Sequence, residues 1–422
     1  MATQVNPPRG MRDFLPGDKA RRERILGVIR DTYTAHGFDE IETPVMEDSS
    51  RLHAGLGGDN EKLAFGVLKR GLTTDDFAAA TEALDLADLG LRFDLTVPLA
   101  RFYASHHGDL PGVFRSIQIA PVWRAERPQK GRYRQFVQCD IDIIGEAGPL
   151  AEIELLTATI DTLRALGLTG CSIRINDRRL LTSMLTVLGF PATEHAAVLI
   201  TIDKLDKLGS HGVVAELRDR AFPDAPVEAL EAFLLQPAAP PQAFGEALIR
   251  ASLPEGVDET AVAELASLGA ALADSSLLQF DPFLVRGMGY YTGTIFEVAH
   301  PEFGYSLGGG GRYDGMIGRF LGTEVPAAGM SLGFERLVDL VQLPADATAS
   351  AVALVHENAD PSVLASLKSE LIAQGLRVRL ERKPRKLAGL LDALVASGFD
   401  RFALVTADTA SVDDLDLRPL SK

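Results

Sequence analysis

Two strand-like segments joined by a basic loop restrict the fold of this chain more than any other feature. Residues 113–124 and 133–145 carry many β-branched and aromatic side chains, which is typical of strands. The short connection between them predicts an antiparallel hairpin, with an antiparallel sheet at the centre of its domain. With 422 residues, the chain is long enough for two or three domains.

The second of these segments has two chemically different faces. Its apolar face comprises Val137, Cys139, Ile141 and Ile143, and its polar face comprises Gln138, Asp140 and Asp142. Residues two apart point to the same side of a strand. The polar face is therefore either a solvated surface of the sheet or one wall of a polar pocket, and the strand alone favours the solvated surface.

An arginine lies inside another stretch that looks like a buried strand, FLVRGMGYYTGTIFE, which begins at Phe283. A guanidinium group does not lose its proton in proteins, so its burial without an anion is very costly. The sequence therefore predicts that Arg286 faces an anionic group.

Other arginines also lie beside glycines or in loops. Arg312 follows four consecutive glycines, and Arg336 is expected at the start of a helix. Arg124 begins a loop that also contains Arg127, Lys130, Arg132 and Arg134. Glycine lets a ligand approach the backbone, and arginine binds phosphate or carboxylate with two parallel donors. No run matches a P-loop or a dinucleotide-binding fingerprint, so we expect a nucleotide held by arginines on an antiparallel sheet.

The pattern along the chain predicts three parts. A helix is expected at residues 18–37, with Ile25, Leu26, Ile29 and Tyr33 on its apolar side, and a strand at residues 38–47. Residues 1–170 and 276–342 are expected to form one α+β domain, interrupted by a mainly helical insertion at residues 171–275. After the linker-like PADATAS, alternating strands and helices predict a small α/β domain at residues 350–422.

Charge and composition exclude several classes of function. A net charge of −16 argues against broad, non-specific nucleic-acid binding, but residues 124–134 and 377–386 are locally basic. Each basic segment is either a solvated face or a surface for a polyanion. No apolar run approaches the roughly 18 residues of a membrane span. The charged, proline-rich N-terminus fits no targeting peptide, and Cys139 and Cys171 are expected to be reduced core residues, so a cytoplasmic protein is predicted.

Five segments in order resemble the motifs of one family. They are GMRDFLP through EIETPVME, LRFDLTVPLAR, VWRAERPQKGRYRQFVQCDIDIIG, LVRGMGYYTG and GMSLGFERL. The first is similar to a dimer-interface motif, the second to an amino-acid-binding segment, and the fourth to a histidine-specific signature. The third and fifth resemble the second and third motifs of class II aminoacyl-tRNA synthetases. Together they resemble the histidyl-tRNA synthetases over nearly the whole chain.

This resemblance implies a function and a set of site residues. The implied protein is a homodimeric, cytoplasmic class II enzyme with an α+β catalytic domain and an anticodon-binding-like C-terminal domain. It would use ATP with Mg²⁺ to activate L-histidine and transfer it to tRNA(His), with Arg286, Arg124 and Arg336 as catalytic residues and no protein side chain assigned to the metal. The implied histidine-binding residues are Asp94, Leu95, Thr96, Arg124, Gln138, Asp142, Arg286, Tyr290 and Tyr291. The implied ATP-binding residues are Arg124, Glu126, Arg132 and Arg336, and Gln129 would lie near the tRNA acceptor end.

One position departs from the family pattern, because Gly289 stands where the family usually has Asp. The change removes a negative charge beside Arg286. Two alternatives therefore stay open from the sequence. One is a regulatory paralogue, such as the regulatory subunit of ATP phosphoribosyltransferase, and the other is an enzyme that passes activated histidine to an acceptor other than tRNA.

Overall fold

The computed structural model describes residues 5–53, 63–129, 131–236, 243–272, 274–286, 289–343 and 350–420. The chain divides into two compact units. The larger comprises Met1–Arg12 and Leu26–Val341, and the smaller comprises Asp13–Ile25 and Gln342–Lys422. Among the described residues, no helix is both long and apolar enough to span a membrane.

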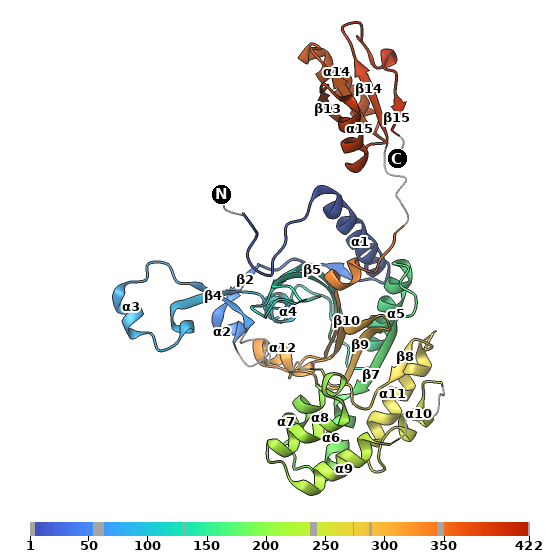
Figure 1. The fold of residues 1–422 in the computed structure, drawn as a ribbon. Helices are drawn as coiled ribbons and strands as arrows, with labels where there is room; N and C mark the ends of the chain where they lie inside the picture. The colour runs from blue at the N-terminus through green and yellow to red at the C-terminus, as the bar shows by residue number, and fades with distance from the viewer. Residues whose placement is uncertain are drawn as a thin grey trace. The chain divides into compact units, whose positions relative to one another are not determined.

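An eight-stranded sheet forms the centre of the larger unit (Figure 1). Its strands, in spatial order, are β1 (Asp39–Glu40), β5 (Phe114–Trp123), β6 (Gln135–Ile144), β11 (Ala327–Gly333), β10 (Phe303–Arg312), β9 (Thr294–His300), β7 (Ser172–Asp177) and β8 (Leu278–Phe280). The pairs from β5 to β7 are antiparallel, and only the two edge pairs are parallel. The predicted antiparallel centre is confirmed.

The hairpin expected from residues 113–145 is β5 and β6, paired antiparallel with Ile117 opposite Ile141. Cys139, Ile141 and Ile143 are fully buried, as the alternation of apolar residues predicts. The opposite face of β6 is buried too, with Asp140 and Asp142 less than 5% exposed. The interpretation of this face as a solvated surface is therefore wrong.

The run of four glycines lies inside strand β10 rather than in a loop. It lies between β9 and β11, with Gly310 opposite both Phe296 and Met330. A Cβ at Gly310 would overlap the carbonyl oxygen of Gly329, so a larger residue would separate the two strands. Gly310 thus allows close packing of the strands, while Gly309 leaves space for the side chain of Arg286.

The N-terminal helix is confirmed with small shifts at its ends. Helix α1 (Pro16–Ala35) buries all four residues of its predicted apolar side. Gly37 follows with a φ of 83°, which suits glycine after a helix. The strand expected at residues 38–47 is interrupted, forming only β1 and β2 (Met46–Asp48). Between them Arg92 donates hydrogen bonds to the carbonyls of Thr43 and Pro44, which takes the place of strand pairing.

Helices cover the central sheet, and a small sheet lies beside it (Figure 1). The helices are α4 (Thr96–His106), α5 (Leu150–Ala165), α12 (Asp314–Leu321) and α13 (Phe334–Val338). The small sheet has the order β2, β4 (Ala87–Leu91), β3 (Phe65–Leu68), and adjoins α2 (Ser49–Leu52), α3 (Thr74–Ala79) and the 3₁₀ turn η2 (Ala83–Leu86). Helix α13 places Arg336 at its third position, close to the predicted helix start.

A group of helices lies between β7 and β8 in the chain, and Figure 1 shows it beside these strands. It comprises α6 (Arg178–Val187), α7 (His195–Ile202), α8 (Leu205–Asp219), α9 (Asp224–Leu234), α10 (Glu246–Ala251) and α11 (Glu259–Ala271).

The expected strand at Phe283 is wrong. Residues 281–286 are irregular and β9 begins only at Thr294, because Asp281 turns the chain by accepting the backbone N–H of Phe283.

The C-terminal part has the alternating structure predicted. Its sheet has the order β13 (Arg377–Arg382), β12 (Ala351–His356), β14 (Arg401–Val405), β15 (Arg418–Pro419), with α14 (Pro361–Ala373), α15 (Leu387–Ala396) and η3 (Val412–Asp414). Strand β12 pairs in parallel with β13 and β14, as crossover helices require. Most of the predicted linker, residues 344–349, lies outside the described residues.

Candidate active site

A cavity of about 740 Å³ opens on the polar face of β6. Strands β10 and β11, the loop after β5 and the segment before β9 complete its walls. The sequence-predicted site residues that line it are Asp94, Thr96, Arg124, Glu126, Gln129, Arg132, Gln138, Asp142, Arg286, Tyr290, Tyr291 and Arg336. Residues up to 242 positions apart, from Asp94 to Arg336, thus meet at one place.

Leu95 is the predicted site residue that does not line the cavity. Its side chain is fully buried, and its carbonyl accepts a hydrogen bond from Gln118 Nε2 at 3.2 Å. It precedes helix α4, whose first residue is Thr96. Asp94 is 2% exposed and its Oδ1 accepts the backbone N–H of Val97 at 3.2 Å, which fixes this carboxylate at the helix start.

Asp142 is a buried acid on the floor of the cavity. Tyr313 donates a hydrogen bond to its Oδ1 at 2.6 Å, and a Cβ at Gly329 would overlap its carboxyl group. Burial raises the pKa of Asp142 to about 7, the hydrogen bond from Tyr313 opposes this rise, and the nearby charge of Asp94 adds to it. The group therefore changes charge near neutral pH.

The Gln138 side chain has a defined orientation. Its Nε2 donates to Ser331 Oγ at 2.9 Å and lies 3.5 Å from both carboxyl oxygens of Asp140. Its Oε1 is buried and has no hydrogen-bond partner among the described residues. Because only an N–H or O–H group can satisfy this oxygen, the floor of the cavity is built to accept a donor from a ligand.

Three acidic groups are concentrated at this floor. Burial raises the pKa of Asp140 well above its ordinary value, and the charge of Asp142 raises it further. Asp94 acts on both groups in the same direction. Such a cluster favours a ligand that brings positive charge or several N–H donors.

Two adjacent tyrosines close the side of the cavity. The rings of Tyr290 and Tyr291 lie 4.8 Å apart, and Tyr290 meets Tyr313 edge to face at 5.9 Å. Desolvation raises the pKa of both hydroxyl groups, so each stays protonated at neutral pH and can donate a hydrogen bond. This wall offers flat aromatic surface with polar ends.

The Arg286 guanidinium lies against strand β10 at Gly309, which has no side chain. A Cβ at Gly309 would lie 2.6 Å from its guanidinium carbon. Its Nη1 donates to Glu297 at 2.8 Å, while its buried Nε has no partner among the described residues. Burial lowers the pKa of Arg286, but Tyr291 and Glu297 outweigh this and raise it. Arg286 is thus fixed on one side and open to an anion on the other.

The loop after β5 supplies a second cationic wall. Arg124 donates from Nε to the carbonyl of Phe93 at 2.9 Å and lies over the Phe136 ring at 5.1 Å. Arg132 pairs with Glu126 at 3.4 Å, and the backbone of Gln129 pairs with that of Arg132. The loop therefore holds two guanidinium groups and one carboxylate in fixed positions beside the floor.

Arg336 completes the cationic wall. It donates to the carbonyl of Ser306 and, at 3.3 Å, to that of Gly131, and it lies over the Tyr305 ring at 5.0 Å. Burial lowers the pKa of Arg336, and the charges of Arg132, Arg124 and Arg286 lower it further. Four arginines thus repel one another in one cavity, an arrangement that a polyanionic ligand relieves.

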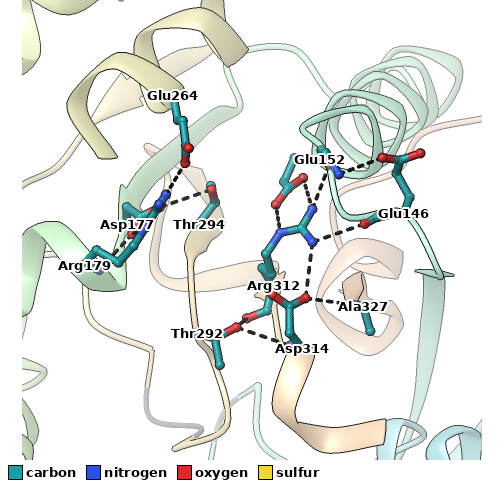
Figure 2. Close-up of polar contacts among 11 residues, drawn as sticks. Glu146, Glu152, Asp177, Arg179, Glu264, Thr292, Thr294, Arg312, Asp314 and Ala327 are labelled. Carbon is teal, nitrogen blue, oxygen red and sulfur yellow. Dashed lines mark hydrogen bonds and ion pairs between the residues drawn. The ribbon is translucent and has the colours of Figure 1, made fainter. Parts of the chain in front are cut away.

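Arg312 does not reach the cavity, although the glycine run before it suggested a ligand-binding role. Its guanidinium makes two hydrogen bonds to Glu152, at 2.6 and 2.7 Å, and others to Asp314 and to the carbonyls of Glu146 and Gly148 (Figure 2). The side chains of Arg312 and Glu152 are 12% and 3% exposed. This arginine joins β10 to α5.

Several lining residues were missed by the sequence prediction. Glu297 is the only acidic residue in β9, a signal that could have identified it, whereas Arg174 lies in β7 together with Asp177. Ile202, Asp203, Leu205, Asp206 and Lys207 come from the α7–α8 junction. No local pattern indicates that this junction of inserted helices borders the cavity.

Comparison with known families and proteins gives a consistent result. The histidyl-tRNA synthetase family model matches residues 10–337. A histidine–tRNA ligase of Leifsonia xyli subsp. xyli is 60% identical, over 100% of both chains. A probable histidine–tRNA ligase of Tropheryma whipplei is 43% identical over 94% of this chain and 95% of the relative.

Solved structures resemble this chain along almost its whole length. The histidyl-tRNA synthetase of Nostoc sp. PCC 7120 has a TM-score of 0.76 and 25% identity, covering 99% of this chain and 95% of its own. A Bacillus halodurans protein, described as an ATP phosphoribosyltransferase regulatory subunit/histidyl-tRNA synthetase, has a TM-score of 0.74 at 22% identity. It covers 96% of this chain and 100% of its own, and shows the shared fold alone.

Proposed function

The chain belongs to the histidyl-tRNA synthetase family and is a histidine–tRNA ligase, and we propose that the cavity on β6 is its active site. The observation that supports this site is the separation of acidic from basic side chains within one cavity. Asp94, Asp140 and Asp142 form an acidic floor, and an arginine wall lies beside it. Histidine offers N–H donors to the floor, and ATP offers phosphates to the wall.

In the proposed first step, the carboxylate of histidine attacks the α-phosphorus of ATP in line. A new P–O bond forms, the bond to the β-phosphate oxygen breaks, and pyrophosphate leaves with the electron pair. The attacking group is already ionised at neutral pH, so the step needs no general base. Negative charge grows on the non-bridging oxygens, and Arg286 and Arg124 would stabilise it from two sides.

Histidine would be recognised by the acidic floor and the tyrosines. Asp94 and Thr96 would bind the α-amino group, while Asp142, Tyr290 and Tyr291 would bind the imidazole ring. Gln138 presents a buried acceptor, Oε1, to an N–H of the same ligand. Amino acids without these donors would leave buried groups unpaired, which is a strong basis for rejection.

ATP would lie along the cationic wall. Arg336 would bind the γ-phosphate, with Glu126 and Arg132 beside the nucleotide. Mg²⁺ would neutralise the triphosphate and be held chiefly by its phosphates.

In the proposed second step, the terminal adenosine hydroxyl of tRNA attacks the carbonyl of the adenylate, and AMP leaves. Gln129, in the loop after β5, would lie near this acceptor end. We further propose a cytoplasmic homodimer, with residues 1–170 and 276–342 as the catalytic domain. Residues 171–275 would be a helical insertion, and residues 350–422 an anticodon-binding domain.

The two alternatives from the sequence gain no support. A regulatory paralogue does not need the arginine wall, and this chain retains Arg124, Arg286 and Arg336. The charge lost at Gly289 has a counterpart in Glu297, which pairs with Arg286 at 2.8 Å. The departure at Gly289 therefore does not leave Arg286 without a carboxylate neighbour.

The test is pyrophosphate exchange into ATP with each amino acid in turn, followed by charging of tRNA. Exchange that depends on histidine, and is lost in Arg286→Gln, is expected, together with histidine attachment to tRNA(His). Exchange without charging would point to another acceptor. No exchange by the folded protein with any amino acid would overturn the assignment.

A further inference from the structure

The carboxylate of Glu297 is shared by two arginines. Its Oε2 accepts from Arg286 Nη1 at 2.8 Å, and its Oε1 accepts from Arg174 Nη1 at 3.3 Å. Arg174 and Glu297 lie directly opposite each other on β7 and β9. The side chain that fixes Arg286 is therefore itself held by a neighbour outside the predicted site.

Arg174 is in turn held by Asp206 of the inserted helices and by Asp281, which follows β8. Its Nη1 donates to Asp206 Oδ2 at 2.8 Å, and its Nε donates to Asp281 at 2.6 Å. Burial lowers the pKa of Arg174, but the charges of Asp281 and Asp206 outweigh this and raise it. Asp281 anchors Nε, while the single Nη1 is shared between Asp206 and Glu297, so the attraction of Asp206 opposes a closer approach of Nη1 to Glu297.

Asp206 belongs to the α7–α8 junction, at the second position of α8. Its side chain is 70% exposed, whereas those of Arg174 and Glu297 are 23% and 17% exposed. Its neighbours Asp203, Leu205 and Lys207 line the cavity beside it. The inserted helices therefore contact the cavity at one edge, through a charged residue directed at Arg174.

We propose that Asp206 and Arg174 are positioning residues that act through Glu297 on Arg286. Asp206 holds Arg174 away from Glu297, so that Glu297 keeps its short contact with Arg286 and sets the orientation of the Arg286 guanidinium. The position of the inserted helices relative to β7 thereby affects the alignment of Arg286. This inference rests on the proposed role of Arg286 at the α-phosphate.

The experiment is steady-state pyrophosphate exchange by Asp206→Asn in the full-length protein. Loss of the charge lets Arg174 move toward Glu297, which loosens Arg286 while leaving its charge in the cavity. We expect kcat to fall about threefold, the worth of one partly exposed ion pair, with KM for histidine and ATP unchanged. Asp206→Glu should restore most of the lost kcat.

Glu264→Gln is the matched control. It removes the pair between Glu264 and Arg179, which also lies within the inserted helices (Figure 2) but has no residue in the cavity. Its kcat should equal that of the wild type. A double variant Asp206→Asn with Glu297→Gln should lose no more than Glu297→Gln alone, because both act on the same contact.

The outcomes separate this proposal from the assignment of the site. An unchanged kcat in Asp206→Asn, an equal fall in Glu264→Gln, or full additivity in the double variant would overturn the positioning role. Arg286→Gln is measured in parallel. If it keeps full exchange activity, the proposed active site itself fails, and if it abolishes exchange while Asp206→Asn is silent, only the positioning role fails.

Discussion

Individual glycines decide where the charged side chains of the cavity lie. Gly309 leaves the space that the Arg286 guanidinium occupies, and Gly329 leaves the space for Asp142. Neither position has a φ in the left-handed region, so backbone freedom is not the reason for these glycines. The reason is close approach of a charged group to the backbone, which a methyl group would prevent.

Gly309→Ala should therefore impair catalysis more than stability. The added methyl would displace the Arg286 guanidinium, and a misplacement of about 1 Å in a reacting site costs roughly a hundredfold in rate. Measured kcat for histidine-dependent pyrophosphate exchange should fall by about that factor, with a melting temperature close to wild type. Gly315→Ala is the control, because a Cβ there meets nothing within 4 Å. Equal activity of the two variants would contradict the role given to Gly309.

The protonation of Asp142 gives a prediction for pH. Its pKa is about 7 in the folded protein, above the ordinary value of 3.8, so the folded state binds an extra proton between these values. The stability that this protonated carboxyl provides is complete below pH 3.8 and is lost as pH rises toward 7. The melting temperature of wild type minus that of Asp142→Asn should fall from pH 5 to 7 and level off by about pH 8. A difference that stays constant from pH 5 to 8 would mean that Asp142 is already ionised in the cavity.

Most of the site residues predicted from the sequence do line the cavity, for reasons that differ from residue to residue. Arg286 was indicated by its apolar surroundings, whereas Gln138 and Asp142 were assigned only through the family resemblance, because their alternation along one strand favoured a solvated surface. Arg312 was misjudged, because the sequence could not show that Glu152 lies opposite it. Glu297 and Arg174 were missed because their proximity becomes apparent only once β7 and β9 are known to pair.

At the scale of elements, strands were predicted correctly where their pattern lies in neighbouring residues. They were predicted wrongly where a residue from a distant segment takes the hydrogen bonds of the strand. The hairpin of β5 and β6 follows from its own residues and short loop. The strand expected at residues 38–47 is broken because Arg92, from a later segment, takes the carbonyls of Thr43 and Pro44. The order of strands in the large sheet also lacks a local signal, since β11 inserts between β6 and β10.

Arg312 joins two such elements, β10 and α5, and its loss should destabilise the larger unit. Arg312→Gln would leave Glu152, 3% exposed, without its cationic partner. Breaking one side of a buried pair commonly costs about 3–5 kcal/mol. Arg218→Gln removes an exposed pair with Glu231 and should cost at most about 1 kcal/mol. Urea unfolding of both variants tests this, and equal losses would show that Arg312 has no special structural role.

At the scale of the whole molecule, the chain combines an acidic body with a local cationic surface. The C-terminal strands and helices were predictable because each has its own spacing of apolar residues and the crossover connections are short. Their role was not, since a run of charge fits a solvated face as well as a binding surface. In the structure, Arg377 and Arg379 lie over the Phe399 ring at 4.7 Å, and Arg382, Arg385 and Lys386 are exposed. These residues lie in or beside the edge strand β13.

This edge is expected to bind tRNA phosphates. The double variant Arg382→Gln with Lys386→Gln should raise KM for tRNA in the charging reaction. Histidine-dependent pyrophosphate exchange, which needs no tRNA, should keep its wild-type kcat and KM. Each lost phosphate contact should also reduce the slope of log affinity against log salt by about 0.7 to 0.9. Arg418→Gln, on β15 at the opposite edge of the same sheet, is the control and should leave charging unchanged. If the double variant charges tRNA as the wild type does, the basic segment is only a solvated face, and the tRNA contacts of this chain must lie elsewhere.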